Sequence, residues 1–284
     1  MKCKFMALLG IVKTDHRLPI TAHRLPMNNG RKQIGLALGG GVVRGFAHIG
    51  VLAVLEQAAV PIDFVTGASV GAIIGAAYAT GMKIPHIIQM AEGLQWFRLA
   101  QPAFSREGLI SFAKLEQWLA QTFGHLHFED LAIPFAIVAT DLEKAESVVL
   151  RSGPLAPAIR ASCSVPGVVT PLRLDGRLLC DGGISNNLPV APLRQMGADF
   201  VIGVDVFQHA PQWRYLGPLG RGLTAIEIMV EHSGGGLQNA DCLIAPDLSG
   251  KTYVRFDKRN ELIALGRAAT EAQLPVIQQF LDNG

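Results

Sequence analysis

The chain has 284 residues, of which 49% are hydrophobic and 17% are charged. This composition excludes a disordered chain, and the length suits one large domain or two small ones. The four cysteines form no CxxC pair, which argues against a zinc site and favours a reducing, cytoplasmic setting. The formal net charge is +2, and no nucleic-acid partner is expected.

Residues 1–33 form a basic segment, with seven lysines and arginines against one aspartate. The opening "MKCKFMALLGIV" resembles a signal peptide, but no small-x-small cleavage site follows it, so we do not expect secretion. "HRLP" occurs twice, and its prolines disfavour a helix. We predict a flexible, solvated segment whose charge also suits peripheral contact with an anionic membrane surface, at the inner face for a cytoplasmic protein.

Two strand-loop-helix units follow from residue 34. "QIGLAL" predicts a buried strand, "GGGVVRG" a glycine loop, and "FAHIGVLAVLEQ" a helix. "PIDFVTGAS" predicts a second strand, and "VGAIIGAAYATG" predicts a helix of small residues that stops at Gly81. Such units build a parallel α/β sheet with right-handed crossovers.

Residues 64–82 carry no charge and are long enough to raise the question of a membrane span. Glycines at a spacing of four there also resemble a membrane dimerisation face. Because glycines and polar side chains lower the average hydrophobicity of this run, we favour the strand and helix of a water-soluble fold.

The remaining elements are predicted from periodicity and turn residues. Residues 84–94 and 109–123 have amphipathic helix patterns, and "PFAIVATDL" and "ESVVLRSG" predict strands joined by a charged turn. A short helix and a hairpin with the turn "DGR" follow, and then "ADFVIGVDVF" predicts a strand near the sheet centre. Residues 208–236 are the most loop-like region and a candidate lid. "DCLIAPDL" predicts a late strand, and residues 261–281 predict a closing helix.

Gly67, Ser69 and Gly71 form the pattern GxSxG between the second strand and its helix. This context is that of a nucleophile elbow, where the chain turns so sharply that larger side chains at the two glycines would clash. The serine hydroxyl is then exposed near the positive end of the helix dipole. The alternative is a small residue in a tight turn.

The loop "GGGVVRG", residues 39–45, offers backbone N–H groups for a phosphate or a developing oxyanion. Its spacing fits neither a P-loop nor GxGxxG. With a nucleophile candidate on the next strand, we favour an oxyanion hole. Arg44 is expected to clamp this loop rather than meet a substrate phosphate.

A serine nucleophile needs a proton acceptor, and the eight histidines offer no clear one. His48 lies in the first helix, where a packing role is expected. His209 and His232 flank the candidate lid and remain candidates for a Ser-His-Asp triad.

An acidic alternative is Asp181, which ends an apolar strand. Gly182 and Gly183 follow it and let the backbone bend so that another group can approach closely. Taken alone, however, DGG is usually a turn.

The three patterns in this order resemble the patatin-like phospholipase family, in particular its bacterial branch related to neuropathy target esterase. The resemblance rests on "GLALGGGVVRGFAHIGVL", "VTGASVGAIIGA", "IRASCSVPGVVTPL" and "LCDGGISNNLPV" and covers roughly residues 34–206. It implies a three-layer α/β/α domain with a mainly parallel central sheet in residues 34–284, with a lid-like and C-terminal part from residue 207. One departure is Val42, where the family often has a fourth glycine, and this narrows the access of an acyl chain.

The resemblance also implies a serine acyl hydrolase of phospholipids, lysophospholipids or simpler lipid esters, without metal or cofactor. Ser69 would attack the ester carbonyl, and Asp181, in a partly dry pocket that raises its pKa, would take the proton. The residues implied as oxyanion donors are Gly40, Gly41 and Val42. Those that support the motifs are Gly39, Arg44, Gly45, Gly67, Gly71, Gly182 and Gly183.

Two alternatives stay open. A regulatory or scaffold protein with a vestigial site would bind a partner without hydrolysing esters. A Ser-His-Asp hydrolase would lose activity on substitution of His209 or His232, whereas a Ser-Asp dyad would tolerate both changes.

Overall fold

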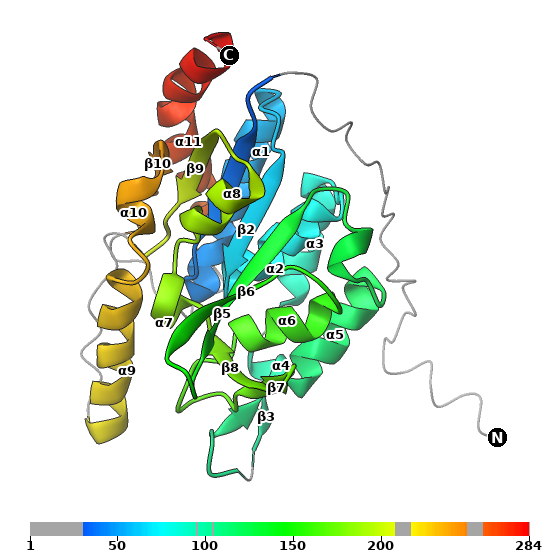
Figure 1. The fold of residues 1–284 in the computed structure, drawn as a ribbon, viewed down its shortest axis with the longest axis vertical. Helices are drawn as coiled ribbons and strands as arrows, with labels where there is room; N and C mark the ends of the chain where they lie inside the picture. Colours follow the sequence, from blue (N-terminus) through cyan, green and yellow to red (C-terminus); the bar gives the residue numbers. More distant parts are fainter. Residues whose placement is uncertain (1–30, 95, 104, 208–216, 249–257, 284) are drawn as a thin grey trace, which may run out of the picture.

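A computed structural model describes residues 31–94, 96–103, 105–207, 217–248 and 258–283. Its centre is an eight-stranded sheet in the order β10-β9-β1-β2-β5-β8-β7 (Figure 1). In this sheet β2 and β8 pair with successive parts of one edge of β5, and β6 pairs with the opposite edge of β5. The strands of this sheet are β1 (Ile34–Leu38), β2 (Phe64–Ala68), β5 (Phe135–Asp141), β6 (Glu146–Leu150), β7 (Leu172–Leu174), β8 (Arg177–Asp181), β9 (Phe200–Val204) and β10 (Cys242–Ile244). A separate short pair consists of β3 (Gln101–Pro102) and β4 (Ile110–Ser111).

The five strands from β10 to β5 are parallel, whereas β6 and β8 run antiparallel to β5. This confirms the mainly parallel α/β sheet and the hairpin at "DGR", which joins β7 and β8. β9 lies next to the edge strand β10 rather than at the centre. Its five residues are nevertheless all buried, which explains its uniformly apolar sequence.

The helices are α1 (Phe46–Gln57), α2 (Val70–Ala79), α3 (Ile84–Gly93), α4 (Trp96–Leu99), α5 (Ala113–Phe123), α6 (Leu155–Ser162), α7 (Gly183–Asn186), α8 (Val190–Met196), α9 (Gly217–Glu231), α10 (Gly236–Asn239) and α11 (Arg259–Asp282). Two short 3-10 helices, η1 (Val42–Gly45) and η2 (Phe128–Asp130), complete the described elements. Helices cover both faces of the sheet, as expected for three layers (Figure 1).

The alternation of side chains along β1 shows how the two outer layers are built. Ile34, Leu36 and Leu38 belong to the large core beneath α1 and α2. Ala37 points to the smaller core beneath α8, and a Cβ on Gly35 would already lie 3.0 Å from a Leu193 methyl group. The large residues on one face of β1 and the small residues on the other therefore set how closely each helix layer packs against the sheet.

Residues 64–82 consist of β2 and α2 inside this core, so the uncharged run is a buried strand and helix. No helix in the part of the chain that the structure describes combines the length and hydropathy needed to cross a membrane.

Two expectations about helices are corrected. The pattern predicted over residues 109–123 begins with β4, and the helix starts only at Ala113. The reason is tertiary pairing, since Ile110 N–H donates to Val168 O at 3.0 Å and Ile110 O accepts from Thr170 N–H at 2.8 Å. Within the predicted loop at 208–236, residues 217–231 form the helix α9 despite its glycines, and its Val230 is buried. Residues 208–216, and residues 1–30 of the predicted basic segment, lie outside the described residues.

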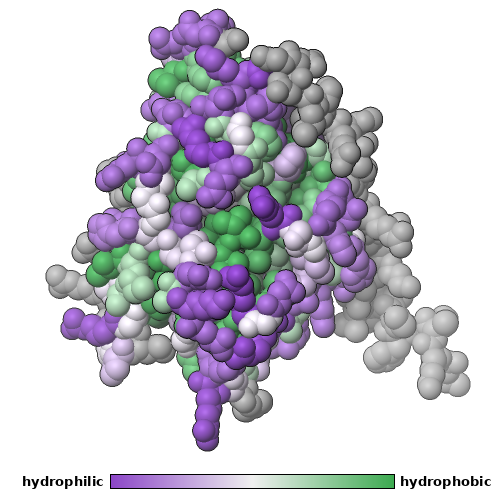
Figure 2. Space-filling view, in the orientation of Figure 1, coloured by the Kyte–Doolittle hydropathy of each residue, from purple (hydrophilic) through white to green (hydrophobic). Residues whose placement is uncertain are grey.

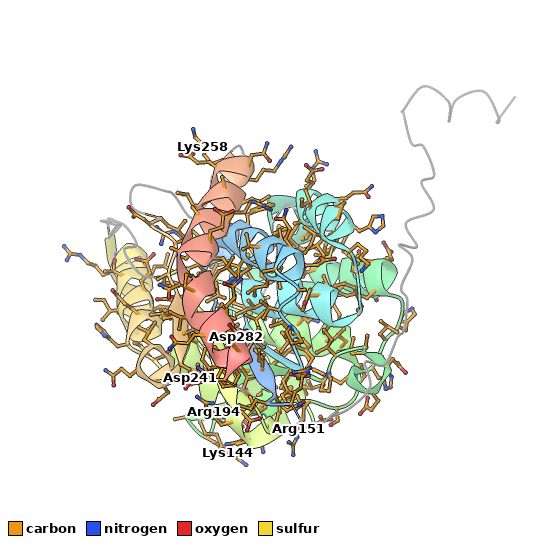
Figure 3. The ribbon with its side chains drawn as sticks, turned by 90° about the horizontal axis from the view of Figure 1, so that it is seen from above. Lys144, Arg151, Arg194, Asp241, Lys258 and Asp282 are labelled. Carbon is orange, nitrogen blue, oxygen red and sulfur yellow. The ribbon has the colours of Figure 1, made fainter. Side chains whose placement is uncertain are left out.

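The closing helix is confirmed as α11, which lies along α1 (Figure 3). The contact is so close that a Cβ on Gly50 would lie 2.0 Å from Ile263 O, and one on Gly266 would lie 2.0 Å from Ala47 O.

Figure 3 also labels Arg194 and Asp241, which form an ion pair between α8 and the residue just before β10. On the face in Figure 2, apolar residues gather near the centre and polar residues surround them.

Candidate active site

Ser69 lies at the sharp turn between β2 and α2, with φ 51° and ψ −122°. Residues other than glycine rarely adopt a positive φ, and such strain clusters at functional sites. A Cβ on Gly71 would lie 2.1 Å from Leu38 O, and one on Gly67 would lie 2.5 Å from Gly71 O. The elbow therefore needs glycine at both positions, as the sequence predicted.

The strand register brings Asp181 to Ser69. On one side of β5, Val138 pairs with Ala68 at the end of β2, and the next residue, Ala139, pairs with Asp181 at the end of β8. β2 and β8 thus meet end to end from opposite directions along the same edge of β5. Ser69 follows Ala68 directly, so the serine and the aspartate become neighbours.

Asp181 is buried, with 6% of its surface exposed. Burial raises the pKa of its carboxyl from 3.8 to about 6, although hydrogen bonds from Gly183 N–H and the Ser69 hydroxyl act in the opposite direction. Gly183 N–H donates to Oδ1 at 2.8 Å. The Ser69 hydroxyl therefore contacts a carboxylate with an increased affinity for a proton.

The three glycines after β1 have separate contacts. Gly39 N–H donates to Val204 O at 3.0 Å and continues the pairing of β1 with β9. Gly40 N–H donates to Oδ1 of the buried Asn187 at 3.0 Å. Gly41 lies next in the chain and lines the cavity that contains Ser69.

Val42 follows the glycines with φ 51°, a conformation that a β-branched residue rarely adopts. Its side chain is 36% exposed and lines the same cavity. Arg44 is fully buried, and its guanidinium donates to Val206 O at 3.4 Å. It therefore contacts the chain just after β9 and is not among the cavity-lining residues, as expected for a clamp.

The cavity beside Ser69 has a volume of about 330 Å³ and a mainly apolar lining. The lining residues are Gly40, Gly41, Val42, Ser69, Ile110, Phe112, Cys163, Val165, Val168, Val169, Asp181, Ile184, Asn187, Phe207, Leu223, Ile226, Glu227 and Val230. Such a lining suits an apolar chain, and its polar side chains include Ser69, Asp181, Asn187 and Glu227.

Among the described residues, no histidine lines this cavity. His48 is buried in α1, where its Nε2 is 2.8 Å from Gly39 O, and burial lowers its pKa to about 4. The neutral ring donates to Gly39 O and supports the glycine loop, which is the expected structural role. His232 is exposed after α9, and His209 lies outside the described residues.

Two side chains that sequence reasoning did not single out support the elbow. The Ser162 hydroxyl accepts from Ser69 N–H at 2.8 Å and donates to Val138 O at 2.7 Å. The thiol of Cys163 is also hydrogen-bonded to Ser69, and burial raises the pKa of this thiol, so it stays neutral. Both residues lie in the run "IRASCSVPGVVTPL", one of the four runs that carry the family resemblance, and this membership is the sequence feature that could have indicated them.

No group of three or more histidine, cysteine, aspartate or glutamate residues in the described ranges is arranged to hold a metal ion.

Sequence comparison matches residues 36–194 to the family described as "Patatin-like phospholipase". The chain belongs to this family. An NTE family protein of Mycobacterium tuberculosis is 40% identical over 177 residues, which cover 61% of this chain and 49% of the relative. The neuropathy target esterase sws of Drosophila melanogaster is 36% identical over 181 residues, 61% of this chain and 13% of the relative. The lysophospholipase NTE1 of Phaeosphaeria nodorum is 34% identical over 190 residues, 65% of this chain and 13% of the relative.

The patatin-like chain thus matches half or less of the length of these relatives. Among solved structures it resembles VipD from Legionella pneumophila, with a TM-score of 0.58, 15% identity and coverage of 98% of this chain and 73% of that chain. It also resembles the type III effector ExoU, with a TM-score of 0.51, 15% identity and coverage of 88% and 53%. At this identity the two structures support the fold alone.

Proposed function

We propose that the chain is a serine acyl hydrolase that cleaves carboxylic esters of phospholipids, lysophospholipids or simpler lipids through a Ser69–Asp181 dyad. The observation that carries the proposal is the end-to-end meeting of β2 and β8, which joins the Ser69 hydroxyl to a buried carboxylate in an apolar cavity. The names of the relatives, lysophospholipase and neuropathy target esterase, support a lipid ester as the substrate class.

In the proposed reaction, Ser69 Oγ attacks the ester carbonyl while Asp181 takes the hydroxyl proton. Asp181 then gives this proton to the leaving alcohol, and an acyl-Ser69 ester remains. Water then attacks that ester while Asp181 takes its proton, and the bond between the acyl carbon and Ser69 Oγ breaks. Asp181 gives the proton to Ser69 Oγ, which releases the fatty acid and restores the Ser69 hydroxyl.

The glycine loop would stabilise the tetrahedral oxyanion. Gly41 and Val42 line the cavity, and we propose their N–H groups as the main donors. Gly40 N–H already donates to Asn187, so it would serve only if it exchanged this acceptor for the substrate. Loss of one such donor costs about 10²- to 10³-fold in rate.

The setting of the reaction is part of the proposal. We place the protein in the cytoplasm, with peripheral contact to an anionic membrane surface through the basic residues near its N-terminus. This contact is motivated by the charge of the sequence alone.

A fluorophosphonate probe and a panel of p-nitrophenyl esters and lysophospholipids test the function. We expect the probe to label the wild type and not Ser69→Ala, and Asp181→Asn to fold but lose turnover. Ser105→Ala, at an exposed serine, is the matched control and should retain labelling. Labelling that persists in Ser69→Ala contradicts the assignment, and loss of turnover in His232→Ala or His209→Ala would instead favour a histidine base.

A further inference from the structure

A chain of hydrogen bonds joins the glycine loop to the Asp181 loop and to α9. Gly40 N–H donates to Asn187 Oδ1 at 3.0 Å, and Asn187 N–H donates to Ser233 Oγ at 2.8 Å. The Ser233 hydroxyl lies 2.7 Å from Gly183 O, its nearer acceptor. Gly183 N–H in turn donates to the Asp181 carboxylate.

Asn187 occupies the centre of this chain. It is 4% exposed and lines the cavity, so its amide is shielded from bulk water yet close to the site. Its Oδ1 and Asp181 Oδ1 both lie 3.0 Å from the position that a Cβ would take on Gly183. The Asn187 side chain therefore binds the glycine loop and lies close to the Asp181 loop, to which Ser233 connects it.

Ser233 connects this centre to the wall of the cavity. It lies two residues after the end of α9 at Glu231, and its hydroxyl is also 3.1 Å from O of Val230. Val230 is a cavity-lining residue of α9, and a Cβ on Gly183 would be 3.5 Å from its methyl group. A shift of α9 would thus move Ser233 and, through it, Asn187.

We propose that Asn187 and Ser233 are positioning residues that hold the glycine loop and Asp181 in register and link both to the position of α9. This inference rests on the proposed function. Asn187 acts by accepting the Gly40 N–H, and Ser233 acts by binding Asn187 and Gly183 together.

The first test replaces the acceptor. Asn187→Leu keeps the branching of the side chain at Cγ but leaves Gly40 N–H without its acceptor, so we expect the loop that presents Gly41 to move. We expect kcat for a soluble ester to fall about 100-fold with little change in KM, because a small misplacement of reacting groups has effects of this size. Asn239→Leu is the matched control, since Asn239 is exposed and its Nδ2 only donates to Gly235 O at 2.8 Å.

The second test separates positioning from general stability. Asn187→Asp keeps an oxygen acceptor for Gly40 N–H but places a second carboxyl group beside Asp181. Because two neighbouring carboxylates repel each other, the second of the pair loses its proton at a raised pKa. We expect kcat to recover relative to Asn187→Leu, with the acid limb of the pH profile raised by about one pH unit. The other titratable groups that face this cavity are Glu227 of α9 and the thiol of Cys163. The thiols of Cys163 and of nearby Cys180 have pKa values raised by burial and stay neutral across this range.

The third test concerns the link to α9. Ser233→Ala removes the hydroxyl, and we expect kcat to fall about threefold to tenfold, the effect of one hydrogen bond. Ser233→Thr keeps the hydroxyl and should restore most of the rate.

The outcomes distinguish this inference from the function on which it rests. If the wild type hydrolyses no more ester than Ser69→Ala, the proposed function fails. If hydrolysis depends on Ser69 but Asn187→Leu keeps the wild-type kcat, or Asn187→Asp keeps the wild-type pH profile, the positioning role is overturned while the function stands.

Discussion

Burial of Asp181 links activity and stability at a single residue. Its pKa of about 6 makes it a stronger base than an exposed carboxylate. The folded state binds the proton more tightly than the unfolded state, so this group stabilises the fold at low pH. That stabilisation is lost as the pH rises from 3.8 to about 6.

The rate should follow the deprotonation of Asp181. We expect kcat/KM for a soluble p-nitrophenyl ester to rise with pH through a limb centred near pH 6, because only the ionised carboxylate accepts the Ser69 proton. A limb centred at the ordinary aspartate pKa would contradict the buried-base interpretation. Thermal unfolding measured over the same range should show that the limb reports ionisation rather than loss of fold.

Val42 holds a β-branched side chain at a backbone conformation that favours glycine. At ordinary positions a glycine variant is less stable than an alanine variant, but a positive φ costs a residue with a Cβ about 1–2 kcal/mol. We therefore expect Val42→Gly to have a higher midpoint of unfolding than Val42→Ala. Both variants lack the valine methyl groups, so the loss of these groups does not affect the comparison. A higher unfolding midpoint for Val42→Ala than for Val42→Gly would contradict strain at this position.

At the scale of elements, α9 is the wall of the cavity that sequence reasoning did not place. Leu223, Ile226 and Val230 line the cavity from one side of the helix. Ile228 and Met229 are 54% and 51% exposed. Apolar side chains therefore lie on both sides of α9, and only the cavity-lining side should affect which substrates fit.

Enlarging a side chain on each side of α9 tests this difference. Ile226→Phe should fill part of the cavity and lower kcat/KM for long-chain esters about tenfold relative to short-chain esters, since a few methylene groups change binding by this amount. Ile228→Phe, on the exposed side, is the control and should leave the chain-length profile unchanged. An equal effect of both variants would show that α9 does not bound the acyl site.

At the scale of the whole molecule, the helix α11 packs against the helix α1. Gly50 and Gly266 let the backbones of α1 and α11 approach so closely that either Cβ would lie 2.0 Å from a carbonyl oxygen of the other helix. Since α1 follows the glycine loop, α11 supports the helix that begins just after the proposed oxyanion donors Gly41 and Val42. Packing at this distance cannot absorb an added methyl group without a shift of one helix.

We expect Gly266→Ala to lower the free energy of unfolding by about 1–3 kcal/mol, the usual cost of overpacking. Gly222→Ala, in α9, is the control because nothing lies within 4 Å of the added Cβ. The control should be neutral or stabilise the protein by roughly 0.5–1 kcal/mol, since alanine favours a helix more than glycine does. Chemical denaturation of the three proteins gives the comparison, and equal stability of the two variants would show that the helices separate easily.

Local patterns were sufficient for much of the fold. Alternating and apolar runs predicted β1, β2, β5 and β6, and glycine spacing predicted the elbow, because these depend on neighbours within a few residues. The two helix errors occurred where distant contacts decided the structure. Ile110 is extended by bonds to residues 168 and 170, and α9 is helical because its apolar side covers the cavity.

The sequence by itself determined the strand-loop-helix order, the strained serine turn and the glycine loop, because each is a property of a short segment. It also supplied the motifs that indicate the family. Only the tertiary structure decided that β2 and β8 meet along one edge of β5, that Asn187 accepts the Gly40 N–H, and that α9 closes the cavity. These contacts join residues more than 100 positions apart, and their partners are chosen by sheet register and packing, which local periodicity does not encode.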